Sequence, residues 1–128
     1  MAQSFRDLLV WQRAMQLAVA IYSLTKNFPR EELYGLTSQI RRAAVSIPSS
    51  IAEGQGRQTT NEFKNFIGIA RGSNFELQTQ LEIARALKMG DPKLLEDAEC
   101  VSHEAGKMLY GMLESLKNAK RRPLTTDH

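Results

Sequence analysis

The sequence has little of what most enzymes and secreted proteins rely on. Its single cysteine, Cys100, cannot form a disulfide within the chain or supply a cysteine-based zinc site. The only two histidines are His103 and the final His128, and no G-x-S-x-G motif is present, which argues against a Ser-His-Asp site. Glu-x-x-His, the motif of di-iron bundles, is also missing. We therefore expect no catalytic residues, no metal and no cofactor.

Long hydrophobic runs are missing as well. No stretch of about 18 apolar residues occurs, as a membrane-spanning helix would need. The first residues lack both the basic and the apolar region of a signal peptide. From this we expect a cytoplasmic protein that binds neither a membrane nor a small-molecule substrate.

Charge is nearly balanced but unevenly distributed. The 17 basic and 14 acidic residues give a net charge of +3 and a pI of about 9.2, which is only mildly basic. Segment 34–58 is basic and contains Arg41, Arg42 and Arg57, whereas segment 91–116 is acidic. Lys120, Arg121 and Arg122 form a further basic cluster. This tail is either a solvated, disordered end or a contact for nucleic acid.

Apolar residues recur at helical spacing of three and four in four segments, 6–27, 33–54, 60–89 and 92–118. Three short connections separate them, so neighbouring helices should be antiparallel. The sequence predicts an all-α protein, an antiparallel up-down-up-down four-helix bundle over residues 1–118. A basic, flexible C-terminal tail is expected over 119–128.

Local signals mark the helix boundaries. Thr59-x-x-Glu62 reads as a capping box, and Asp91 followed by Pro92 as a helix start. Pro48 lies inside the second segment, where the chain either turns or continues as a kinked helix. The apolar spacing continues through Pro48 without a change of phase, which favours a helix kinked there.

Polar residues form a seam on the second and third helices. The seam comprises Arg42, Ser46, Ser49 and Glu53, and Ser73, Glu76 and Gln80. If the two faces meet, Arg41 or Arg42 would pair with Glu76 in an interhelical or subunit network, which fixes register more than it adds stability. A catalytic carboxylate is the weaker interpretation, because no histidine or apposed acid lies nearby.

Aromatic side chains fall mostly on the apolar faces. Trp11, Tyr22 and the phenylalanines are therefore expected in the core rather than as platforms for base stacking. Tyr34, beside Gly35 at a helix start, is expected to be exposed. Cys100 is expected to be a partly buried thiol.

Three segments together resemble a known family. Residues 5–14, 34–57 and 72–81 read FRDLLVWQRA, YGLTSQIRRAAVSIPSSIAEGQGR and GSNFELQTQL. They are similar to the bacterial four-helix-bundle family encoded within 23S rRNA intervening sequences, also called the S23 ribosomal protein family. The resemblance spans residues 5 to 117.

The resemblance implies a homo-oligomer, a barrel-like pentamer, with no known catalytic activity. It also relates the chain to the accessory variability determinant protein of diversity-generating retroelements, a pentamer that binds nucleic acid through basic residues. Arg41, Arg42 and Arg57 lie in the quoted motif. With Lys120, Arg121 and Arg122 they are the candidate contacts to RNA or DNA. The alternative is a protein–protein interaction scaffold without nucleic-acid binding.

Overall fold

The computed structural model describes residues 4–121, with side chains described for residues 4–119. Four long helices account for most of this range: α1 (Leu9–Thr25), α2 (Leu36–Gln55), α3 (Thr60–Ala86) and α4 (Pro92–Arg121). Two short 3-10 helices, η1 (Phe5–Asp7) and η2 (Arg30–Glu32), precede α1 and α2. Over residues 4–121 there is no β-strand, so the predicted all-α bundle is confirmed.

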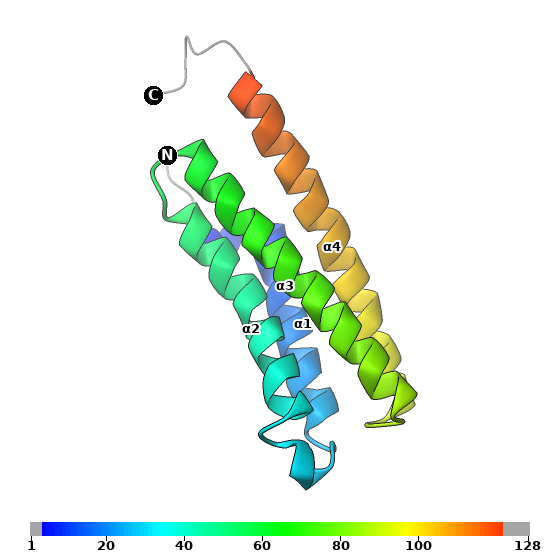
Figure 1. Ribbon diagram of the computed structural model, residues 1–128. Coiled ribbons are helices and arrows are strands. Elements are labelled where there is room, and N and C mark those ends of the chain that lie inside the picture. The colour runs from blue at the N-terminus through cyan, green and yellow to red at the C-terminus, as the bar shows by residue number, and fades with distance from the viewer. Residues whose placement is uncertain (1–3, 122–128) are drawn as a thin grey trace.

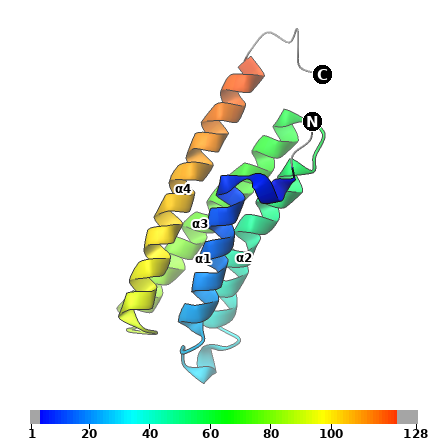
Figure 2. The same ribbon diagram turned by 180° about the vertical axis from the view of Figure 1, so that it is seen from behind.

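The helices form a four-cornered bundle. Following the colours in Figures 1 and 2, successive helices run in opposite directions. Helix α2 packs against α1 and α3, and α4 packs against α3 and α1. The pairs α1/α3 and α2/α4 therefore lie diagonally across the core.

The predicted caps form. The Thr59 hydroxyl accepts a hydrogen bond from the Glu62 amide at 3.1 Å, and the Asp91 carboxylate accepts from the Lys93 amide at 2.8 Å. Helix α1 starts later than expected because η1 takes the preceding residues. Helix α4 continues through Arg121, beyond the expected end at 118, and the rest of the predicted tail lies outside the described residues.

The core is formed by one apolar stripe from each helix. Its largest fully buried apolar side chains are Leu17, Ile21, Leu24, Ile40, Ile47, Ile51, Ile67, Leu77, Leu81 and Leu109. The apolar residues of α1 form a face wider than this stripe, and Met15 and Tyr22 at its edge are exposed. Two neighbouring helices cover only part of so wide an apolar face. Leu87 follows the last residue of α3 as its C-cap, and it is exposed.

Helices α2 and α3 approach each other closely near Gly54. A Cβ atom on Gly54 would lie 2.7 Å from the Phe66 Cβ and 3.0 Å from the Phe63 ring. Pro48 is buried inside α2, and the helix continues through it. The turn alternative is therefore wrong, while the kink stays a prediction.

Gly54→Ala should destabilise the fold by about 1–3 kcal/mol, because the new methyl group overlaps the Phe66 side chain. The matched control is Gly68→Ala on α3, where an added Cβ meets no atom within 4 Å. That change should stabilise the protein by about 0.5–1 kcal/mol through helix propensity alone. Urea denaturation followed by circular dichroism measures both. A stabilising Gly54→Ala would show that the two helices do not touch there.

Candidate functional site

Arg41 turns from α2 toward α1. Its Nε donates a hydrogen bond to the Thr25 hydroxyl at 2.8 Å, and its guanidinium lies 4.6 Å from the centre of the Tyr22 ring. The Thr25 hydroxyl in turn donates to the Ile21 carbonyl at 2.8 Å. This chain of contacts holds the Arg41 charge in place at the α1–α2 surface.

Arg42, the next residue, is exposed, and no hydrogen bond, ion pair or ring contact joins it to any side chain that the structure describes. Consecutive residues point about 100° apart around a helix, so Arg42 stands on the outer ridge of α2. It lines two surface grooves, one on each side of that ridge.

The first, the tyrosine groove, lies beside the start of α2 and has a volume of about 480 Å³. Its lining residues are Tyr22, Leu33, Tyr34, Thr37, Ser38, Arg41, Arg42 and Val45, and none of them is acidic. The Tyr34 side chain is 94% exposed. Its predicted exposure is confirmed, whereas Tyr22, expected in the core, is half exposed because Arg41 covers only one face of its ring.

An unsatisfied polar atom marks the wall of the tyrosine groove. Thr37 is only 3% exposed, and its hydroxyl oxygen has no hydrogen-bond partner among the described residues. A buried hydroxyl left in this state costs stability, about 1–3 kcal/mol. Such groups in folded proteins call for an explanation, and an ordered water or ion inside the fold is one.

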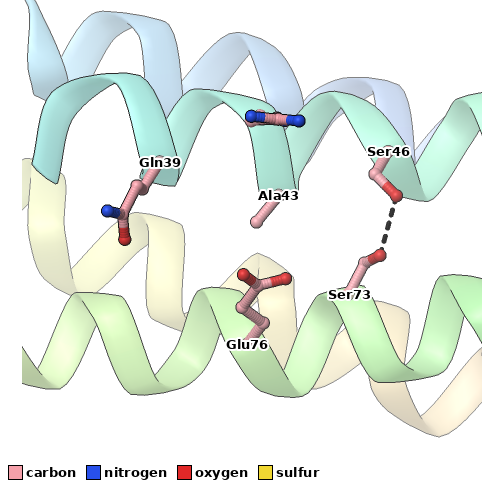
Figure 3. Close-up of a pocket in the computed structure, with 6 residues that line it drawn as sticks. Gln39, Ala43, Ser46, Ser73 and Glu76 are labelled. Atoms are coloured by element: carbon pink, nitrogen blue, oxygen red, sulfur yellow. Dashed lines mark hydrogen bonds between the residues drawn. The ribbon is translucent and has the colours of Figure 1, made fainter. Parts of the chain in front are cut away.

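The second, the seam groove, lies between α2 and α3 and has a volume of about 460 Å³. Its lining residues are Gln39, Arg42, Ala43, Ser46, Ser73 and Glu76. Figure 3 shows Glu76 rising from α3 toward Ala43 on α2. The Ser46 and Ser73 hydroxyls form a hydrogen bond of 2.7 Å across the helices at one side of the groove (Figure 3).

The predicted polar network forms only in part. Ser46 and Ser73 meet, but Arg42 and Glu76 line the same groove without an ion pair. Arg41, the other predicted partner of Glu76, is bound to Thr25 instead.

The other members of the seam are spread over different settings. Glu53 pairs at 3.3 Å with Arg57, which lies just beyond the end of α2, and Ser49 is exposed. Gln80 is buried, and its side-chain oxygen has no hydrogen-bond partner among the described residues. These residues do not converge on one point.

Of the remaining predicted contacts, Arg57 is already engaged, since its guanidinium also lies 4.8 Å from the centre of the Phe66 ring. The side chains of Lys120 and Arg121, and the whole of Arg122, lie outside the described residues. Arg42 is therefore the described arginine of the motif that keeps its charge fully available.

Helix α4 carries few features of a site. Cys100 is exposed, not partly buried as expected. The pKa of Lys93 is raised, chiefly by its hydrogen bond to Asp97, and neither residue lines a groove described above. Within residues 4–119 no group of three or more histidine, cysteine or acidic side chains is placed to hold a metal ion. No helix in that range is long and apolar enough to cross a membrane.

One buried polar cluster was missed by the sequence analysis. Asn74 on α3 donates to the Ser102 carbonyl at 3.0 Å and accepts from the Ser102 hydroxyl at 2.7 Å. Gln78 donates to the same hydroxyl at 3.1 Å. The sequence did contain a signal for this cluster. Asn74 falls at helical spacing between Ala70 and Leu77 on the buried stripe of α3, and a polar residue at such a position needs a buried partner.

Comparisons place the chain among known proteins. Residues 6–111 match the model of the family described as 23S rRNA-intervening sequence protein. A crystal structure from Bacteroides thetaiotaomicron, described as a protein with unknown function from the S23 ribosomal protein family, has a TM-score of 0.73 and 24% identity. The match covers 82% of this chain and 98% of that chain, and at this identity it shows the fold. No curated protein matches the chain significantly. The relation to accessory variability determinants stays a prediction.

Asn74→Leu should destabilise the bundle by about 2–3 kcal/mol, because it leaves the buried Ser102 hydroxyl without its acceptor. Ser102→Ala should cost a similar amount, because it leaves the buried Asn74 Oδ1 without its donor. The double variant should be more stable than the sum of the two changes implies, because the pair is coupled. Urea denaturation of all three variants measures the coupling, and strict additivity would contradict a bonded pair.

Proposed function

Because this chain belongs to the 23S rRNA-intervening sequence protein family, we propose that it is a non-enzymatic protein that assembles into a cytoplasmic homopentamer and binds RNA through the tyrosine groove of each copy. The observation that carries the RNA-binding part is the composition of that groove. It combines two arginines with two exposed tyrosines and contains no acid.

Each lining group suits a different part of a single strand. Guanidinium groups neutralise phosphates, which is the main source of affinity and of its salt dependence. Aromatic rings stack on unpaired bases, the part of RNA that proteins recognise best.

The distribution of charge supports this face over the others. Acidic residues gather on α4, which lies diagonally opposite α2 in the bundle. A strand along α2 is therefore separated from most of these acids by the core. Assembly would strengthen the attraction of RNA to the protein, since five copies of net charge +3 would act together on a polyanion.

Exposed apolar side chains support self-association. Helix α1 presents an outer face of Leu9, Met15 and Val19, and α3 and α4 present Phe75 and Tyr110, all exposed. Phe75, expected in the core, lies instead on this surface, where Arg71 contacts both aromatic rings.

The two apolar faces favour a ring. Helices α1 and α3 lie diagonally, so one flat partner surface cannot cover Val19 and Phe75 together. Two different faces that pair head to tail generate closed rings. The number five comes from the family resemblance. If the same faces instead bind another protein, the chain is an interaction scaffold, which is the second candidate.

Tyr34→Leu should weaken binding of a labelled single-stranded RNA of about eight nucleotides roughly fivefold or more, because it removes the stacking ring. Tyr34→Phe keeps the ring and should bind like the parent protein. Since Tyr34 is 94% exposed, neither change should alter thermal stability. The dissociation constant of the labelled RNA would be measured by fluorescence anisotropy at about 50 mM and about 200 mM salt.

Arg42→Ala should lower RNA affinity and flatten its salt dependence, since one positive charge is lost from the RNA-binding surface. The charge-matched control is Lys93→Ala on the acidic helix α4, which should change neither. Absence of RNA binding at low salt would refute RNA binding and leave the scaffold. Tighter binding of duplex DNA than of RNA would refute the choice of RNA.

The parent protein should have a mass near 72 kDa by light scattering, five times its 14.4 kDa chain. Val19→Glu and Phe75→Glu should each dissociate the ring while keeping the helices, and Ser115→Glu on α4 should leave it intact. A mixture of the two dissociating variants should form heterodimers and nothing larger, because each variant keeps one intact apolar face that can pair with the intact face of the other. A parent mass of 14.4 kDa would contradict self-association.

A further inference from the structure

We propose that the seam groove between α2 and α3 is a binding site selective for a guanine base. The inference deepens the RNA-binding function proposed above and rests on it for the source of the base. The observation that carries it is the pairing of Arg42 with Glu76 in one groove, both exposed and neither bound to the other.

The two charged groups stand on different helices. Glu76 projects from α3 toward Ala43 on α2, as Figure 3 shows, and Arg42 belongs to the opposite wall. Ala43 contributes only a methyl group, and the Ser46–Ser73 hydrogen bond closes one side. The result is a polar space with a donor wall and an acceptor wall.

Its volume, about 460 Å³, falls within the range of small-ligand sites. Gln39 projects into the same space from α2 (Figure 3) and adds an amide that can both donate and accept. A planar base fits these lining groups better than an apolar ligand, because alanine is the only apolar residue among them.

The carboxylate selects the base. An ionised Glu76 can only accept hydrogen bonds, through two oxygens side by side. Guanine presents two neighbouring donors, N1–H and the N2 amino group, on its Watson–Crick edge. Adenine and cytosine each place a donor beside an acceptor there, and uracil places its one donor between two acceptors. Only guanine therefore satisfies both oxygens at once.

The guanidinium completes the match. Arginine donates two parallel hydrogen bonds to the O6 and N7 acceptors of guanine in many complexes. In the seam groove Arg42 is the strong donor available to an oxygen or nitrogen acceptor of the base. Adenine, which carries an amino group where guanine has O6, would place a donor against this donor.

Arg42 also joins the two grooves. It lines both the tyrosine groove and the seam groove, so a strand with a phosphate at Arg41 can place the next base over the α2 ridge, beside Arg42. The same chemistry would take the base of a free guanine nucleotide. The experiment therefore has one arm for each source of the base.

The first arm uses uridine-rich RNA strands of about eight nucleotides that differ at one central position, which is guanine, inosine or adenine. By fluorescence anisotropy the guanine strand should bind about tenfold more tightly than the adenine strand. The inosine strand should fall between them, because inosine keeps N1–H and O6 but lacks the N2 amino group.

Glu76→Gln should abolish the preference for guanine, because an amide cannot accept from both guanine donors. The adenine strand should bind at least as tightly as it does to the parent protein, since one negative charge is removed from the groove. The matched control is Glu82→Gln, also exposed on α3 but outside the seam groove, which should keep the preference. Thermal stability of both variants, followed by circular dichroism, checks the fold.

The second arm titrates the parent protein with guanosine and adenosine monophosphate and follows heat release. Equal binding of all three strands, with no response to either nucleotide, would overturn the guanine site and leave RNA binding intact. Binding of guanosine monophosphate that Glu76→Gln removes, without binding of any strand, would support the site and refute RNA binding. Binding of neither strands nor nucleotides would overturn both.

Discussion

The close packing of α2 against α3 is the constraint on which the rest of the surface depends. Gly54 leaves no side chain where the backbones approach, and the Ser46 and Ser73 hydroxyls bond directly across the helices. Small side chains of this kind bury little area themselves, but they set the distance between two polar walls. Arg42 and Glu76 line the groove between these two helices and form no ion pair.

Two adjacent arginines on one helix have different surroundings. Arg41 turns to α1, where Thr25 and Tyr22 hold it, whereas Arg42 stands on the ridge with its charge unpaired. Helical geometry separates the two directions by about 100°, so neither can replace the other. In the proposed complex, the Arg41 guanidinium, fixed by Thr25, would be preorganised for a phosphate, and Arg42 would reach a ligand on either side of the ridge.

Much of the fold follows from local patterns. Apolar spacing predicted the four helices, and the caps at Thr59 and Asp91 form as their side chains dictate. Less of the site could be predicted. Asn74 and Ser102 both lie on buried stripes, yet only the register of α3 against α4 pairs them. Tyr22 and Phe75 fit an apolar face, yet each lies outside what the neighbouring helices cover.

The sequence by itself determined the all-α class, the positions of the helices and the residues that can form a polar seam, because these depend on neighbours within a few positions along the chain. The tertiary structure decided which members of the seam meet and which arginine stays free. Those outcomes depend on the rotation and spacing of whole helices. Helix packing fixes both through contacts, such as Gly54 against Phe66, between residues distant in the sequence.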